Sequence, residues 1–296
     1  MPPSLPILDT APGDLATLRV EIDRIDDALH DLLMRRAEIV TRVGASAGKA
    51  GSRVALRPGR EAAIIRRLLA RHEGNLPGWA LVRLWRELLA ATTSMQRPFV
   101  VAVCETGEGA AFTQAAREQF GALTPLRVHP GPAGAIADVV AGAVSAAVLP
   151  LPRQDDSRQA AWWTTLLHAD DPRIHIIARL PFWAPRSENS PTAEALVVAA
   201  VAPDPSGEDR SLIGLELDRD MTRARLTTAL AAADLTPGAL MVLRRDPGEP
   251  LARALAEVDG MLTDTDPRLA RLARLGAPRP PVVLGAYARP VNGAAA

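Results

Sequence analysis

Cysteine and lysine are nearly absent from this chain of 296 residues. The single cysteine, Cys104, excludes an internal disulfide framework and is typical of a protein in a reducing compartment. Of the 34 basic residues, 33 are arginine and one, Lys49, is lysine. We attribute this bias to a GC-rich genome that replaces lysine wherever arginine suffices.

Long apolar runs and an excess of one charge are missing as well. No stretch approaches the ~18 apolar residues of a membrane span, and the start, MPPSLPILDT, lacks the basic and apolar parts of a secretion signal. The formal net charge is 0, which favours neither a nucleic acid nor a membrane surface as partner. The scattered histidines show no metal-ligand spacing, and no P-loop is present. We therefore expect a soluble cytoplasmic protein, without a metal or cofactor, of two or three domains.

The most regular stretch runs from Leu15 to about Val43, where apolar residues recur at alternating steps of three and four. They are Leu15, Leu18, Ile22, Ile25, Leu29, Leu32, Ile39 and Val43. This heptad spacing predicts a long helix with an apolar seam that packs on another helix. Arg36 falls where an apolar residue is expected, and a guanidinium there needs an anion or a carboxylate. A structural ion pair, for example with Glu61, and a ligand site stay equally open.

Two shorter helices follow, from about Arg60 to His72 and from about Pro77 or Gly78 to Gln96. The expected core positions are Ile64, Ile65, Leu68 and Leu69 in the first and Leu81, Leu84, Trp85, Leu88 and Leu89 in the second. Glu61 shares the apolar face of its helix, and Thr92 and Gln96 continue the stripe of theirs. Gly44, Gly48 and Gly51 mark the end of the long helix, and residues 1–13 are Pro-rich and expected to be disordered.

Beyond Pro98 short buried strands alternate with helices, which predicts an α/β region. From Ser211 onward the order is βαββαβ, the order of a ferredoxin-like split sandwich. The sequence thus predicts a multidomain α plus α/β protein with a helical domain at 1–97, an α/β domain at 98–205 and a ferredoxin-like domain at 206–296.

Three strings in the helical region resemble the all-helical chorismate mutases, especially the mutase domain of bifunctional chorismate mutase–prephenate dehydratases. They are LRVEIDRIDDALHDLLMRR, RPGREAAIIRRL and WRELLAATTSMQ, and they cover roughly residues 14–97. The resemblance implies three helices in an interlaced homodimer. It also implies the rearrangement of chorismate to prephenate in phenylalanine and tyrosine biosynthesis, which needs no cofactor, nucleophile or proton transfer.

The resemblance also assigns roles to residues. Arg19 and Arg36 each bind a substrate carboxylate, Gln96 donates to the ether oxygen, and Glu61 accepts from the ring hydroxyl. Arg57, Arg60 and Thr92 are further substrate-binding positions. Arg19 and Arg36 lie ~25 Å apart along one helix and ~100° apart around it. One small substrate cannot reach both in one chain, so a second protomer is expected to supply Arg19.

Two positions depart from the family pattern. Ala47 stands where the family has a lysine, and Arg57 replaces a usual acidic residue. Lys49 follows two residues later, ~220° around a continuous helix from Arg36. We expect the helix to open at Gly44 or Gly48, so that Lys49 serves as the catalytic lysine, although a leftover surface lysine is an almost equal alternative.

The rest of the chain resembles a truncated prephenate dehydratase followed by an ACT domain. AVCETGEGAAFTQAAREQFG and IADVVAGAVSAAVLPLP are similar to dehydratase segments, and VVLGAYARP is similar to the end of an ACT domain. Pro152 stands at a usual acidic position, the second lobe is too short, and no Thr-Arg-Asp-Thr motif occurs. Dehydratase activity is therefore not expected. Two alternatives to a mutase stay open: a catalytically silent regulatory or binding subunit, and a bifunctional mutase–dehydratase.

Overall fold

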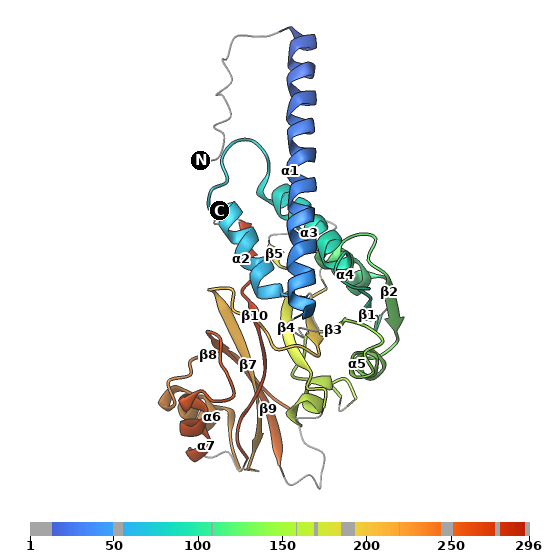
Figure 1. Cartoon of the computed structure of the whole chain (residues 1–296). Coiled ribbons are helices and arrows are strands. Elements are labelled where there is room, and N and C mark those ends of the chain that lie inside the picture. The colour runs from blue at the N-terminus through green and yellow to red at the C-terminus, as the bar shows by residue number, and fades with distance from the viewer. Residues whose placement is uncertain are drawn as a thin grey trace. The chain divides into compact units, whose positions relative to one another are not determined.

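A computed structural model describes residues 14–49, 56–107, 109–157, 159–168, 171–184, 193–218, 220–243, 251–275 and 279–293 (Figure 1), with the side chains of 47–49 outside this set. The Pro-rich segment 1–13 and Gly51, on which two predictions fall, lie outside the described residues. The chain divides into two compact units, Met1–Arg53 and Val54–Ala296. In the described part, no helix is both long and apolar enough to span a membrane.

The first unit contains one helix, α1 (Leu15–Lys49), of 35 residues. The predicted helix is confirmed, and its eight seam residues are all 43–63% exposed. Among its described side chains, 14–46, none is buried. An apolar seam of this length without burial is typical of a helix that packs on a partner helix.

The expectation that this helix opens at Gly44 or Gly48 is wrong. α1 continues without a break through both glycines to Lys49. A glycine inside a helix costs only ~1 kcal/mol relative to alanine, and alanine and serine around these glycines sustain the helix. On this continuous helix, position 49 lies ~220° around the axis from position 36.

The two shorter helices begin the second unit as α2 (Pro58–Leu69) and α3 (Gly78–Ser94). Both are confirmed, but α3 turns a different face to the core than expected. Its buried residues are Val82, Arg86, Leu89, Thr92 and Thr93. Leu84, expected in the core, is 59% exposed, and Leu81, Trp85 and Leu88 are only partly buried. α3 therefore has one face on the core and a second, partly exposed apolar face.

A nine-stranded sheet forms the rest of the unit, in the order β2-β1-β3-β6-β4-β10-β7-β9-β8. Its strands are β1 (Val101–Cys104), β2 (Leu126–His129), β3 (Ala146–Pro150), β4 (His175–Leu180), β6 (Ala195–Ala199), β7 (Asp209–Leu217), β8 (Pro237–Val242), β9 (Ala252–Asp259) and β10 (Val282–Ala288). A small pair is formed by β5 (Trp183–Ala184) and β11 (Val291–Asn292). The helices are α4 (Ala111–Phe120), α5 (Pro132–Val140), α6 (Arg223–Ala232) and α7 (Pro267–Arg274), with a 3₁₀ helix, η1 (Trp162–Leu167).

Strand β1 shows why the α/β half folds as predicted. All four of its residues are buried, and alternate side chains of a strand point to opposite faces. Val101 and Val103 pack in the core cluster that contains α4, whereas Ala102 and Cys104 pack in the cluster that contains α5. Burial raises the pKa of the Cys104 thiol to about 11, so this cysteine stays protonated and unreactive.

The C-terminal half has the predicted βαββαβ order. Its strands are antiparallel neighbours in the order β10-β7-β9-β8, which is the ferredoxin-like arrangement, and α6 and α7 pack on one face through Leu226, Leu230, Leu269 and Leu272 (Figure 1). The ACT resemblance and the three-domain division stay predictions. One continuous sheet contains strands from both predicted domains, 98–205 and 206–296.

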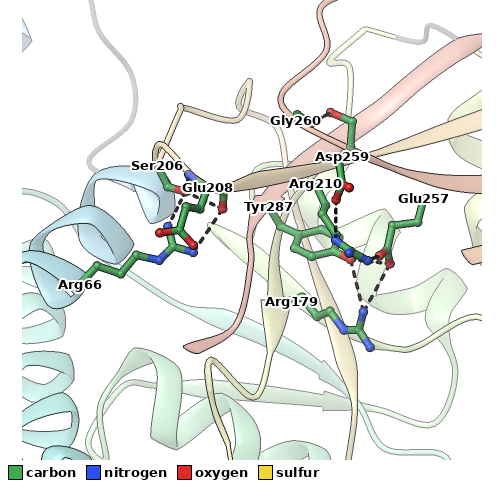
Figure 2. A network of polar contacts seen from close by, with 10 residues as sticks. Arg66, Arg179, Ser206, Glu208, Arg210, Glu257, Asp259, Gly260 and Tyr287 are labelled. Atoms are coloured by element: carbon green, nitrogen blue, oxygen red, sulfur yellow. Dashed lines mark hydrogen bonds and ion pairs between the residues drawn. The ribbon is translucent and has the colours of Figure 1, made fainter. Parts of the chain in front are cut away.

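A polar network crosses the strands where the two halves of the sheet meet (Figure 2). Glu257 on β9, 7% exposed, accepts hydrogen bonds from Tyr287 Oη at 2.6 Å and Arg179 Nη1 at 3.3 Å, and also pairs with Arg210. Burial, together with the Glu257 carboxylate, raises the pKa of the Tyr287 hydroxyl, so it remains a donor. The network joins β4, β10, β7 and β9 and fixes their relative positions.

Candidate functional site

Glu61 and Arg86 form a buried ion pair between α2 and α3. Arg86 Nη1 lies 3.0 Å from Glu61 Oε2, and the two side chains are 4% and 13% exposed. The Arg86 guanidinium also lies over the Phe182 ring, 4.6 Å from its centroid. Burial raises the pKa of the Glu61 carboxyl, the Arg86 charge opposes this rise, and Asp204 adds to it. The predicted hydroxyl acceptor is thus held in place by a cation from the next helix.

Arg86 was not among the residues predicted from the sequence. It lies within the string WRELLAATTSMQ, four residues after Val82 and three before Leu89, both buried. That helical spacing puts it on an apolar face, which was the signal available for a buried cation. The signal was missed because the leucines next to it suggested a different buried face.

The N-terminus of α2 is capped by a carboxylate from a distant segment. Asp204, in the polar linker between β6 and β7, accepts from the backbone N–H groups of Gly59 at 2.9 Å and Arg60 at 3.0 Å. Its Oδ2 also lies 3.4 Å from Arg57 Nε. A carboxylate at a helix N-terminus satisfies unpaired amides and the helix dipole. Arg57, expected on substrate, is therefore bound to Asp204, while the Arg60 side chain is exposed.

Arg66 ties the middle of α2 to the same linker (Figure 2). It donates to Ser206 Oγ at 2.9 Å and to the carbonyl oxygens of Glu208 at 3.2 Å and Arg289 at 2.5 Å. Together with the Asp204 cap, these bonds attach α2 to the segment that leads into β7 and to the end of β10.

Thr92 and Gln96 lie one turn apart at the C-terminal end of α3. Thr92 is buried and its hydroxyl donates to Leu88 O at 2.9 Å. Gln96 is half-buried and its Nε2 donates to Thr92 O at 3.3 Å. Among the described hydrogen bonds, Gln96 bonds to Thr92 and Glu61 bonds to Arg86. These bonds do not connect the two predicted site residues Gln96 and Glu61.

The remaining predicted residues lie on α1. Arg19 is exposed and Arg36 has intermediate exposure. They are separated by 17 helical positions, which corresponds to ~25 Å along the axis. Because α1 is a unit of its own, the structure gives the α1 residues and the α2–α3 residues as two separate sets. Across the described residues, no group of three or more His, Cys, Asp or Glu side chains could hold a metal ion.

The helical part of the chain matches a known protein family. Residues 18–97 match the model of the family chorismate mutase type II, which assigns this N-terminal segment to a chorismate mutase domain by sequence. The predicted family resemblance is confirmed.

Curated relatives carry both activities in their names. The bifunctional chorismate mutase/prephenate dehydratase of Stutzerimonas stutzeri is 32% identical over 142 residues, 46% of this chain and 38% of that protein. The protein of the same name from Aquifex aeolicus is 37% identical over 131 residues, 43% of this chain and 34% of that protein. The matched region thus spans little more than a third of these relatives.

Solved structures are similar to the larger part of the chain. GqqA, described as a novel type of quorum quenching acylase, aligns with a TM-score of 0.48 and 16% identity over 64% of this chain and 94% of its own. Prephenate dehydratase from Streptococcus mutans aligns with a TM-score of 0.47 and 13% identity, over 64% and 97%.

Proposed function

We propose that this chain is a chorismate mutase that converts chorismate to prephenate without a cofactor, in the biosynthesis of phenylalanine and tyrosine. The observation that carries the proposal is the family match over residues 18–97, which contains every proposed site residue. The reaction is a rearrangement within one molecule. Catalysis then consists of folding a flexible dianion and stabilising the charge that grows on the ether oxygen.

The proposed roles follow the chemistry of the side chains. Arg19 and Arg36 bind the two carboxylates, because a guanidinium is always charged and binds a carboxylate with two parallel hydrogen bonds. Gln96 donates to the ether oxygen, and Thr92 helps to hold a carboxylate. Gln96 would turn from Thr92 O to the substrate, an exchange of one hydrogen bond for another.

Glu61 is proposed to accept the ring hydroxyl of the substrate. Its described ion pair uses Oε2, and a carboxylate has roughly four lone-pair sites, so Oε1 can accept a further hydrogen bond. Arg60 and Arg57 are proposed to add positive charge at the start of α2. For Arg57 this requires exchange of Asp204 for the substrate.

We further propose a homodimer in which α1 of each protomer packs on its partner. The exposed seam of α1 and the second apolar face of α3 support it, because exposed apolar stripes of this length mark helix–helix interfaces. A dimer also resolves the ~25 Å separation of Arg19 and Arg36 along α1, since Arg19 then comes from the partner subunit.

The deciding experiment measures chorismate consumption by the purified full chain. We expect turnover above the spontaneous rate. Arg36→Ala and Gln96→Ala are each expected to lower kcat/KM by about 100-fold or more, the usual effect of removing a preorganised donor. The matched control is Arg35→Ala, which removes an exposed arginine next to Arg36 and should leave kcat/KM within about twofold. A folded protein without turnover would refute the proposal.

A catalytically silent binding or regulatory subunit is the second candidate. It is favoured by Ala47 and by the contacts that Arg57, Glu61 and Gln96 already make within the chain. It predicts saturable binding of a chorismate analogue by a chain that shows no turnover. A bifunctional enzyme, the third possibility, would form phenylpyruvate from prephenate in the same preparation.

A further inference from the structure

A cavity of about 550 Å³ opens between α3, α4 and the segment that connects β4 to β5. It lies entirely in the second unit. Of the residues proposed for the mutase site, none lines it in the described part of the chain. Its volume is in the range of small-molecule sites, roughly 300–1,000 Å³.

Three aromatic side chains line this cavity in a chain that has few. The sequence has five Trp, four Phe and one Tyr, and the cavity is lined by Trp79, Phe182 and Trp183. The Trp183 ring packs closely on two glycines, where a Cβ on Gly78 would come 3.1 Å and one on Gly293 2.0 Å from it. The cavity therefore offers aromatic faces, of which that of Trp183 is closely packed, to a flat or ring-shaped apolar group.

Most of the polar groups around the cavity already have partners. Arg86 is paired with Glu61, Arg117 donates to the carbonyl of Ala122, and Glu87 accepts from the Ala122 amide at 3.0 Å. These contacts fix the wall but leave little capacity for a ligand.

Gln119 and Arg83 differ from them. Gln119 is 7% exposed, lines the cavity, and takes part in none of the hydrogen bonds that the structure describes. The fully buried side-chain atoms without a partner in the described part of the chain belong to Trp163 and Arg210, so the Gln119 amide is accessible from the cavity and can bind a ligand acceptor. Arg83, exposed on α3, likewise has no ion pair among the described contacts. Within the described part of the chain, the cavity thus combines a cation without an ion pair, an accessible amide and aromatic side chains.

We propose that this cavity binds a small carboxylate that carries a ring. The ring packs among Trp79, Phe182 and Trp183, and the carboxylate accepts hydrogen bonds from Arg83 and Gln119. Two donors of this kind suit an anion, and the three aromatic side chains favour one that carries a ring. This site goes beyond the proposed mutase activity and does not depend on it.

The proposal is tested by titrating the full chain with phenylacetate and measuring binding by calorimetry and tryptophan fluorescence. We expect saturable binding and a change in fluorescence, because Trp79 and Trp183 line the cavity. The neutral analogue 2-phenylacetamide should bind at least about tenfold more weakly, since it lacks the charge that Arg83 recognises. Arg83→Gln and Gln119→Leu should each weaken phenylacetate binding about tenfold or more.

Three controls make the result specific. Arg67→Gln removes an exposed arginine of α2 that does not line the cavity and should leave the affinity unchanged. Arg36→Ala should also leave it unchanged, which separates the cavity from the mutase site. Arg83→Glu reverses the charge at an exposed position and should abolish binding. This variant tests the proposal on its own if Gln119→Leu fails to fold.

The proposal is overturned if the folded chain shows no saturable binding of phenylacetate at millimolar concentration. It is equally overturned if Arg83→Glu binds as well as the native chain, or if the neutral amide binds as tightly as the acid. Because chorismate is absent from these titrations, either result leaves the mutase proposal standing.

Discussion

At the scale of single residues, the structure shows a buried cation, Arg86, that was not predicted from the sequence. Arg36 attracted attention because it interrupts an apolar seam, and it has intermediate exposure. Arg86 is buried, 4% exposed, paired with Glu61 and stacked on Phe182. A lone charge in an apolar environment needs a partner, so Glu61 is held by Arg86 before any substrate arrives.

Arg86→Met is expected to destabilise the fold in a pH-dependent way. Breaking a buried pair leaves an uncompensated charge and costs about 3–5 kcal/mol. Arg86 lowers the raised pKa of Glu61, so its loss raises that pKa further. A carboxyl with a raised pKa in the folded state stabilises the fold below its unfolded pKa and loses that contribution as pH rises through the folded pKa. The variant should therefore be weakest at neutral pH and recover toward ~4.3, the ordinary glutamate value.

Urea unfolding of the native chain and the variant, at neutral and at acidic pH, measures this. Adding Glu61→Gln to Arg86→Met removes the unpaired charge and should restore part of the loss at neutral pH. Arg83→Met, which removes an exposed arginine from the same helix, should change stability by no more than about 0.5 kcal/mol. A loss in Arg86→Met that is independent of pH would show that packing on Phe182, not charge, is the main contribution.

Lys49 is a second residue whose proposed role depends on the course of its helix. On an uninterrupted α1 it lies 13 positions after Arg36 and ~220° around the helix. We expect Lys49→Ala to lower kcat/KM less than about threefold, against about 100-fold for Arg36→Ala. Chorismate turnover by the two variants compares them directly. Equal losses would indicate that the helix opens at Gly44 or Gly48 when substrate binds.

At the scale of elements, local patterns predicted most of the fold. Heptad spacing predicted α1, and alternation of buried strands with helices predicted β1 to β4 and β6. The βαββαβ order of the C-terminal half is confirmed. The buried face of α3 was predicted only in part. Leu89 is buried as expected, but Leu84 is exposed, because the helix has a second apolar stripe through Leu81, Leu84 and Leu88. Periodicity finds an apolar face but does not say which of two faces the core covers.

Strand β10 contains the position on which the joining of the two sheet halves depends. Gly285 has a φ of 145°, and a Cβ there would lie 2.0 Å from Ile176 O on β4. Gly285→Ala should lower the free energy of unfolding by about 3 kcal/mol or more, through strain and displacement of β4. Gly260→Ala is the matched control, with a φ of 87° but no atom within 4 Å of the added carbon, and should cost only about 1–2 kcal/mol. Equal losses in denaturant unfolding would contradict a close approach of β10 to β4.

At the scale of the whole molecule, the sequence could not predict contacts between distant segments. Asp204 caps α2 from 144 residues beyond Arg60, and Gln119 reaches the cavity from a helix that looked purely structural. A single aspartate in a polar linker carries no local sign of the helix it will meet. For the same reason the sequence predicted each half of the sheet but not that β4 and β10 pair and join the two halves.

Hybrid dimers test how the proposed site is shared between subunits. If each site takes Arg36 from one chain and Arg19 from the partner, Arg19→Ala and Arg36→Ala homodimers are both inactive. A mixed dimer then contains one intact site and one doubly damaged site. Statistical mixing gives half mixed dimers, so co-refolding equal amounts should restore about a quarter of native turnover.

If both arginines served one site from the same chain, every site would lack one of them and mixing would restore nothing. Chorismate consumption before and after co-refolding separates the two arrangements. The control is a mixture of Arg35→Ala and Arg36→Ala, which shows the turnover of sites that keep both arginines.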